Sequence, residues 1–519
     1  MLYLGKYYRS AILMTGTVLL LGACTKDFDK INTDHTKLKD VDKQQVPYLF
    51  SFAEAASSNK GSSYQTAQNL FADLYAQYYA TTSTGFQTDR YSIRYDWLDI
   101  GWRNVYTQVA PQLRAVLENT DTSSTENALA RIVWVFAFHR LTDYYGPVPY
   151  FMAGMDTTVV YDPQDKIYDD FFKQLTGAVE ILKKNGGESL YGDYDLIYSG
   201  DVAKWIKFAN TLRLRLALRI SAVDPARAKK EAEAAVRDGV LTDIADDAYM
   251  YKTLDGTDVN GLAYIAVWNE FSMSSTMLSY LKGFDDPRLE NYFQPAVKTG
   301  KYASLRNGQE NTDLNKDANT PAYTSQIGKS WITWDGSTWI PDNTRHMDIM
   351  HAAEAYFLRA EGALNGWEMD GNAQELYEKG IETSLKQWGV TDAAKISSYI
   401  SSTQKPAAPD DYQQSPPVDP AITVKWAQDE ATERAQIGLQ KWLALYPDGL
   451  EAWAEVRRSG YPRQYPVVKS DNADLPQGFI KRVPYPTVEQ QNDANALKQG
   501  QSLLNGPDNI ATPLWWDKD

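Results

Sequence analysis

Residues 353–367 read AEAYFLRAEGALNGW, and this stretch decides the fold class. Its apolar and small residues recur at helical spacing, Asn365-Gly366 breaks the pattern, and a second stripe of the same period follows over 377–388. The first stripe is Ala353, Tyr356, Phe357, Ala360 and Leu364, and the second is Tyr377, Ile381, Ser384, Leu385 and Trp388. The pattern predicts a tetratricopeptide-like helical hairpin with small residues at the crossing, a unit that must stack on others to bury its apolar face.

The same helical period recurs outward along the chain. It is clear over 168–184, 225–238 and 437–445, and again over 205–220, where Asp201 is placed to cap the helix N-terminus. Three arginines crowd that last helix, at 213, 215 and 219, and therefore need acidic partners from other helices. We expect a mostly α fold in which helical hairpins form the scaffold.

Long stretches between these helices follow neither the helical nor the strand period. They cover residues 81–96, 255–276, 299–343, 404–420 and 463–486. Connections of such length in a compact domain are usually functional or disordered. The stretch over 404–420 has the composition of a mobile surface loop, whereas those over 81–96 and 299–343 carry many aromatic residues, which favours order.

The N-terminus carries the pattern of a bacterial lipoprotein signal. Basic residues precede a short apolar run over 11–21, and Leu21-Gly22-Ala23 leads directly to Cys24, the chain's one cysteine. Because lipid transfer needs the thiol and ordinary cleavage does not, we expect a signal peptide over 1–23 and lipid attachment at Cys24. The alternative is an ordinary secretory signal beside a chance cysteine. Residues 24–45 are mostly charged or polar and suit a tether, which leaves 46–519 as a single ligand-binding domain.

Composition narrows the functional class. A net charge of −15 and a pI near 4.9 repel phosphate backbones, which argues against nucleic-acid binding. With a single cysteine the fold cannot be held by internal disulfides, and 519 residues can bury a large core without them.

Catalytic signatures are missing from the sequence. It contains no G-x-S-x-G, no P-loop, no G-x-G-x-x-G and no H-E-x-x-H, and its four histidines are scattered. An acidic pair for glycoside hydrolysis stays open, because sequence spacing does not fix distances in space. Asp313, Asn315 and Asp317 alternate like the first half of a calcium loop, yet Ala318 and Thr324 stand where that loop needs glycine and glutamate, which favours a solvated turn without a metal or cofactor.

Two clusters of aromatic residues are the candidate ligand site. Their rings lie among Arg, Asp, Asn and Thr, and such rings with polar neighbours can stack on a sugar and bind its hydroxyl groups. The clusters are Tyr91, Tyr95 and Trp97 in RYSIRYDW, and Trp331, Trp334 and Trp339 in WITWDGSTWIP.

Several stretches together resemble one known family. They are LTDYYGPVPY (141–150), KFANTLRLRLALRIS (207–221), FDDPRLENYF (284–293), AEAYFLRAEGALNGW (353–367), QKWLALYPDGLEAWAEVRRSGYPR (440–463) and RVPYPTVEQQNDAN (482–495). In order and over essentially the whole chain they are similar to the SusD/RagB-like outer-membrane lipoproteins, closest to the SusD-like branch. Lys26-Asp27-Phe28-Asp29 also resembles the acidic surface-export signal of such bacteria.

The resemblance implies a mostly helical SusD-like fold whose long loops make the ligand face. It implies a lipid-anchored protein on the outer surface of the outer membrane, without enzymatic activity, which delivers glycans to a SusC-type TonB-dependent transporter. Three alternatives stay open. The protein could cover the same kind of transporter but bind oligopeptides, it could be a protein scaffold without small ligands, or it could be a surface glycosidase. The family's motifs mark its scaffold, so the six ring residues rest on composition alone.

Overall fold

The computed structural model describes residues 41–59, 61–155, 158–187, 189–251 and 259–518. The chain divides into two compact units, 1–45 and 46–519. In the first, the Gln45 amide donates to the Asp42 carbonyl oxygen across a turn. In the second unit, no helix of the described residues has the length and apolar character to cross a bilayer.

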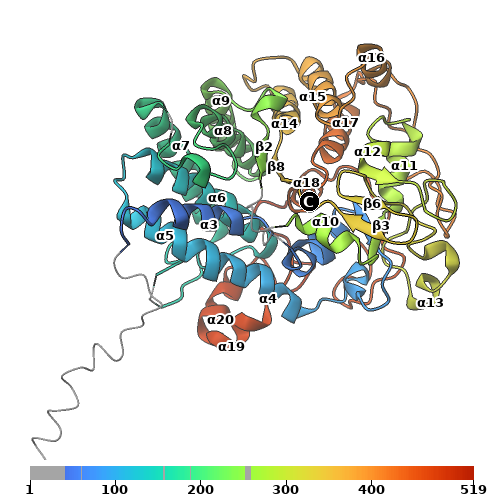
Figure 1. The fold of residues 1–519 in the computed structure, drawn as a ribbon, viewed down its shortest axis with the longest axis horizontal. Helices are drawn as coiled ribbons and strands as arrows, with labels where there is room; N and C mark the ends of the chain where they lie inside the picture. The colour runs from blue at the N-terminus through green and yellow to red at the C-terminus, as the bar shows by residue number, and fades with distance from the viewer. Residues whose placement is uncertain (1–40, 60, 156–157, 188, 252–258, 519) are drawn as a thin grey trace, which may run out of the picture. The chain divides into compact units, whose positions relative to one another are not determined.

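Helices build most of this unit (Figure 1). The first group is α3 (Val46–Ala56), α4 (Tyr95–Arg103), α5 (Ala110–Asn119), α6 (Thr125–Tyr145), α7 (Gln164–Asn185), α8 (Val202–Arg219) and α9 (Pro225–Asp238). The second is α10 (Gly261–Ala266), α11 (Ser275–Gly283), α12 (Leu289–Tyr292), α13 (Asn311–Leu314), α14 (Ala352–Leu364), α15 (Ala373–Gln387), α16 (Ala393–Ile400), α17 (Glu430–Ala444), α18 (Gly449–Ser459), α19 (Thr487–Asn492) and α20 (Ala494–Ser502). Two π-helical segments, η1 (Gln65–Asp73) and η3 (Asn104–Val109), and four short 3₁₀ turns, η2 (Gln87–Arg90), η4 (Gly192–Tyr194), η5 (Ile244–Asp246) and η6 (Asp317–Asn319), complete them.

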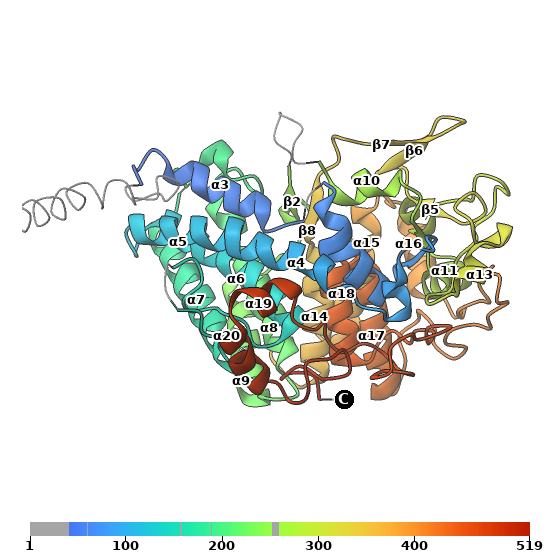
Figure 2. The ribbon, with the colours of Figure 1, turned by 90° about the horizontal axis from the view of Figure 1, so that it is seen from below.

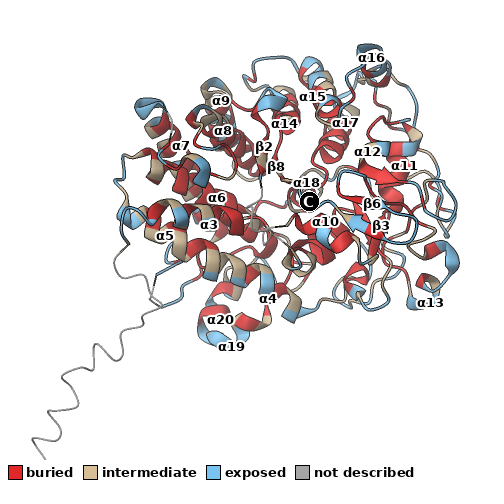
Figure 3. Cartoon of the chain, viewed as in Figure 1, coloured by how far each residue is buried: buried red, intermediate tan, exposed pale blue. Residues whose placement is uncertain are grey.

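Sequential helices pack in pairs, which confirms the mostly α fold. α6 packs on α7, α8 on α9, and α14 on α15, the hairpin predicted from residues 353–388. The crossing of α14 and α15 needs a small residue, since a Cβ added at Gly380 would lie 2.8 Å from the Phe357 ring. The inward faces of α6, α8 and α14 are buried (Figure 3), so the hairpins form the core.

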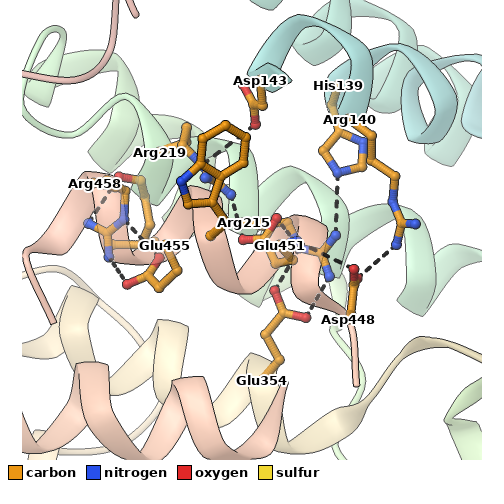
Figure 4. Close-up of polar contacts among 12 residues, drawn as sticks. His139, Arg140, Asp143, Arg215, Arg219, Glu354, Asp448, Glu451, Glu455 and Arg458 are labelled. Carbon is orange, nitrogen blue, oxygen red and sulfur yellow. Dashed lines mark hydrogen bonds and ion pairs between the residues drawn. The ribbon is translucent and has the colours of Figure 1, made fainter. Parts of the chain in front are cut away.

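The crowded arginines of α8 find the acidic partners that the sequence requires. The Asp201 carboxylate caps α8 by accepting from the Lys204 amide at 3.1 Å. Arg213 pairs with Glu231 of α9, while Arg215 pairs with Glu354 of α14 and Arg219 with Glu451 of α18. We call Arg215, Arg219, Glu354 and Glu451 the ion-pair joint (Figure 4), because it fastens three helices from distant parts of the chain.

Strands are short and occur as four antiparallel pairs. They are β1 (Tyr79–Thr81) with β3 (Phe271–Met273), β2 (Ala248–Met250) with β8 (Met347–Met350), β4 (Phe293–Gln294) with β5 (Gln326–Ile327), and β6 (Ile332–Trp334) with β7 (Trp339–Pro341). Residues 404–420 and 463–486 contain neither helix nor strand, as predicted.

Three stretches predicted as irregular contain regular elements. Residues 81–96 include η2, residues 255–276 include α10 and β3, and residues 299–343 include α13, η6, β5 and the β6–β7 hairpin. Each of these elements spans at most six residues: α10 has fewer than two full helical turns, and the strands have three residues each or fewer. Pieces this short leave no readable period in the sequence, since period detection needs a window of about 11–18 residues for a helix.

Candidate ligand-binding face

Two exposed rings stand on and just after α10. Tyr264 is 39% exposed and Trp268 is 40% exposed, and their ring centroids lie 5.5 Å apart in an edge-on contact. The neighbouring Leu262, Ile265 and Ala266 are buried, so the short helix turns its apolar side inward and its aromatic side to solvent. A pair of aromatic faces open to water at this geometry offers a stacking platform.

α10 is held in place by its first two positions. The Asn260 side chain accepts from the Ala263 amide at 3.0 Å and so caps the helix. Gly261 lies directly against Tyr64, because a Cβ added there would come within 2.3 Å of the Tyr64 Cβ. A larger residue at 261 would push α10 away from η1 and tilt both exposed rings.

The β6–β7 hairpin supplies a third exposed ring. Trp334 and Trp339 are cross-strand partners with centroids 5.1 Å apart, and Trp334 is 38% exposed whereas Trp339 is buried. The turn is closed by Asp335, whose carboxylate accepts from the Ser337 and Thr338 amides; these bonds lower its pKa. The hairpin packs on α10 through β7 (Figure 2). We call the rings of Tyr264, Trp268 and Trp334 the ring face.

Trp331 lies in the core behind the hairpin. It is 0% exposed, and its ring lies 5.6 Å from that of Trp388 and 5.8 Å from that of Tyr446. The Arg345 guanidinium covers it at 4.9 Å from the ring centroid. In this structure Trp331 has no surface for a ligand and supports the hairpin, as the buried Trp339 supports Trp334.

The other predicted cluster is divided in the same way. Tyr91 is buried, with its hydroxyl donating to the Gly478 carbonyl oxygen at 3.3 Å. Tyr95 is 41% exposed, and Trp97 is partly exposed, packed edge-on against Phe86 at 5.5 Å and covered by the Arg94 guanidinium at 4.7 Å. Within the described part of the chain no ring contact links this cluster to the ring face. Ligand contact by any of the six predicted residues stays a prediction, and burial leaves Tyr95, Trp97 and Trp334 as those that can reach a ligand.

The segment before the Tyr91–Trp97 cluster nevertheless lies next to the segment that follows Trp268. β1 pairs with β3, and the Thr82 amide donates to the Glu270 carbonyl oxygen at 3.0 Å, only two residues beyond Trp268. The segment leading to Phe86 and Trp97 therefore begins beside the segment that carries the ring face.

Sequence reasoning missed Tyr264 and Trp268. They stand in a stretch predicted to be irregular, where the four-residue spacing of two aromatic side chains was the available signal. One turn of helix is enough to bring such a pair together, and α10 provides little more than that.

The calcium-like stretch begins in α13 and continues into the 3₁₀ turn η6. Asp313 lies in α13, and the Asn319 side chain donates to the Asp313 carbonyl oxygen at 2.8 Å and to the Gln309 side chain at 3.0 Å. Among the described residues no group of three or more His, Cys, Asp or Glu side chains is placed to hold a metal ion. Calcium binding by Asp313, Asn315 and Asp317 stays untested. The described residues begin at 41. The predicted signal peptide, Cys24 and most of the predicted tether therefore lie outside them.

Small cavities lie among the helices and loops of the scaffold. Three of them have volumes of about 50, 30 and 10 Å³. Asn59 and Arg140 line the first two, and Asp348 and Asp448 line the last two, so the cavities follow one another. Their volumes correspond to a few water molecules, and a sugar chain does not fit.

Comparison with known proteins assigns the fold and its family. The sequence profile of the SusD-like family, described as Susd and RagB outer membrane lipoprotein, matches residues 27–517. The chain belongs to the SusD-like family. No curated protein matches it.

Several solved structures share this SusD-like fold. A chitin-binding SusD homologue from Flavobacterium johnsoniae is 33% identical, with 92% of this chain and 99% of that chain covered and a TM-score of 0.84. A SusD-like protein from Bacteroides thetaiotaomicron is 30% identical over 91% of this chain and 99% of the other, with a TM-score of 0.80. A third structure, described as a chitin-binding protein, is 29% identical over 91% of this chain and all of the other, with a TM-score of 0.75.

Proposed function

We propose that this SusD-like protein binds a neutral glycan on its ring face, without turnover, and delivers it to a SusC-type TonB-dependent transporter. The observation that carries the proposal is the set of three aromatic side chains, Tyr264, Trp268 and Trp334, each about two-fifths exposed on two elements that pack together. Exposed rings of this kind stack on the apolar face of a sugar while neighbouring polar groups bind its hydroxyls.

Charge favours a neutral ligand. The chain carries −15 overall, and the one carboxylate in the hairpin turn, Asp335, has its pKa lowered by backbone hydrogen bonds and is ionised at neutral pH. A polyanionic glycan would meet repulsion from both. Two of the similar structures are described as chitin-binding, and chitin is a neutral polymer, which makes it the first glycan to test.

The family supports the remainder of the proposal. SusD-like proteins are outer membrane lipoproteins, and a lipid at Cys24 with a tether over 24–45 would anchor this domain while leaving its ring face free to move over a transporter. Attachment of two or more acyl chains gives stable anchoring, since each buried CH₂ contributes about 0.8 kcal/mol. Surface orientation and transporter contact are parts of the proposal.

Affinity electrophoresis tests the binding step directly. The full chain, purified in detergent, is run through gels containing glycol chitin, xylan or soluble starch, and a peptide digest is titrated by calorimetry alongside. We expect retardation in at least one polysaccharide gel, abolished in the double variant W268A/W334A and unchanged in F151A. Phe151 is a suitable control because it is 41% exposed and lies in a loop after α6.

Other outcomes would reject the proposal. Heat from peptides with no retardation would assign the protein to oligopeptide capture, and no binding in either assay would leave a scaffold that acts through its transporter. Release of reducing ends from any polysaccharide would indicate a glycosidase. Co-purification of the transporter with the W268A/W334A variant should persist, because the ring substitutions remove ligand contacts only.

A further inference from the structure

A second group of rings lies beside the ring face, at the open end of the β2–β8 pair. Tyr251 follows β2 and is 59% exposed, and its ring centroid lies 5.7 Å from that of His346, which precedes β8. Tyr249 backs the histidine with an edge-on contact at 4.1 Å. Neither Tyr251 nor His346 belongs to the predicted clusters, and the proposed function does not use them.

A direct hydrogen bond joins this second group to α10. The Asn260 side-chain nitrogen donates to the His346 carbonyl oxygen at 2.8 Å, while the oxygen of the same side chain caps α10. Asn260 therefore fixes the position of His346 against the helix that carries Tyr264. The β6–β7 hairpin is also close to His346 along the chain, because only a few residues separate the end of β7 from His346. The hairpin that carries Trp334 is therefore linked covalently to the second group. Figure 2 shows β2, β8, α10 and the β6–β7 hairpin along one edge of the molecule.

Several charges beneath the second group are paired with one another, and Asp342 adds a further carboxylate near His346. Arg345 pairs with Asp348 at 2.9 Å, and the same carboxylate lies 3.4 Å from the His351 ring, whose other nitrogen faces Asp247 at 3.2 Å. Burial lowers the pKa of His346 to about 4, which leaves its ring neutral at pH 7. A neutral imidazole beside one wide-open phenol ring suits an uncharged ring-shaped ligand unit.

We infer that Tyr251, supported by His346, is a second sugar subsite, and that the ligand is an extended neutral glycan chain that lies across both this subsite and the ring face. The inference rests on the proposed function and adds the substrate class, a chain of several sugar units in place of a mono- or disaccharide. Each end of such a glycan would bind to a different group of rings. The second group therefore increases the affinity only for glycans long enough to reach both groups.

Calorimetry with oligomers of increasing length tests the inference. The full chain in detergent is titrated with chitin, xylan and starch oligomers from dimer to octamer, as wild type, Y251A and Y412A. Tyr412 is the matched control, a tyrosine 43% exposed in the connection between α16 and α17. We expect wild-type affinity to rise with length, and Y251A to weaken the long oligomers about five- to tenfold while changing the dimer less than about twofold. Y251W, which keeps a stacking face, should retain most of the wild-type gain with length.

The outcomes separate this inference from the proposed function. Wild-type affinity that does not change with length, or a Y251A effect that is equal for dimer and octamer, overturns the second subsite and leaves glycan binding by the ring face intact. Absence of binding by every oligomer to the wild type overturns both. Circular dichroism of Y251A should match the wild type, as expected for an exposed side chain.

Discussion

The ion-pair joint and the ring face are built in opposite ways. Arg215 and Arg219 are about 1% exposed and are held by carboxylates 2.6 and 2.5 Å away, so each charge is paired inside the scaffold. The side chains of Tyr264, Trp268 and Trp334 each expose roughly two-fifths of their surface to water. Removing one member of a buried ion pair leaves an uncompensated charge in the scaffold and destabilises the fold, whereas a partly exposed ring contributes less to stability and is available to a ligand. Stability and binding should therefore respond to different substitutions.

The largest expected effect comes from breaking the joint. Arg215→Met leaves the Glu354 carboxylate buried without its partner at 2.6 Å. Removing one member of a buried pair costs about 3–5 kcal/mol, so we expect a loss of that order in the free energy of unfolding measured with urea.

An exposed ion pair provides the control for that variant. Arg94 pairs with Asp96 at 2.8 Å with both side chains about half exposed, and Arg94→Met should leave the midpoint of urea unfolding nearly unchanged. Equal losses in the two variants would contradict the distinction between buried and exposed pairs.

The β6–β7 hairpin places a buried tryptophan and an exposed tryptophan three residues apart, so that their contributions to stability can be compared directly. Trp331→Ala empties a fully buried site between Trp388 and Tyr446 and should lower the free energy of unfolding by about 3–5 kcal/mol. Trp334→Ala removes a ring that is 38% exposed together with its edge-on contact to Trp339, and should lower the free energy of unfolding by only about 1 kcal/mol. Thermal melts of the two variants check this, and a large loss in Trp334→Ala would mean that its ring is structural.

The His351 site should make the scaffold sensitive to alkali. Burial alone would lower the pKa of His351, but the facing carboxylates of Asp247 and Asp348 raise it to about 10. A raised histidine pKa stabilises the fold fully below the unfolded value of about 6.5, and this contribution is lost as the pH rises towards 10. We expect about 3 kcal/mol to disappear between pH 7 and 10.

Urea titrations of the wild type and His351→Gln over pH 7–10 measure that contribution. Arg345 and His346 also face the site, and they are unchanged in both proteins. The variant should lose much less stability over this range than the wild type, and parallel curves would show that the histidine carries no charge in the fold.

The smallest predicted effect apart from the controls is the most informative about function. Trp334→Ala should weaken glycan binding about tenfold, which corresponds to about 1.4 kcal/mol, while the protein still unfolds in one cooperative transition. Trp331→Ala should show the reverse pattern in any fraction that remains folded.

Sequence predicted the scaffold well, for a physical reason. The stripes over 353–364 and 377–388 are long enough to display the helical period, and the three arginines of α8 demanded acidic partners that α9, α14 and α18 supply. These are properties of long helices that pack on one another, and they leave a repeated pattern in the chain.

The ligand face was predicted only in part. Trp331 and Tyr91 stand in aromatic, polar stretches like Trp334 and Tyr95, yet the first two are buried, because burial there depends on Tyr446 and Gly478 far along the chain. Tyr264 and Trp268 were missed because α10 is six residues long and leaves no period. Composition identifies candidate rings, and the tertiary structure decides which of them face solvent.

The central claim is that exposed rings on α10 and the β6–β7 hairpin capture a glycan. Affinity electrophoresis of the wild type, W268A/W334A and F151A in glycol chitin, xylan and starch gels tests it most directly. The account predicts that at least one gel retards the wild type and F151A, and that W268A/W334A runs as freely there as in a gel without polysaccharide while still unfolding in a single cooperative transition. Undiminished retardation of the double variant would contradict it.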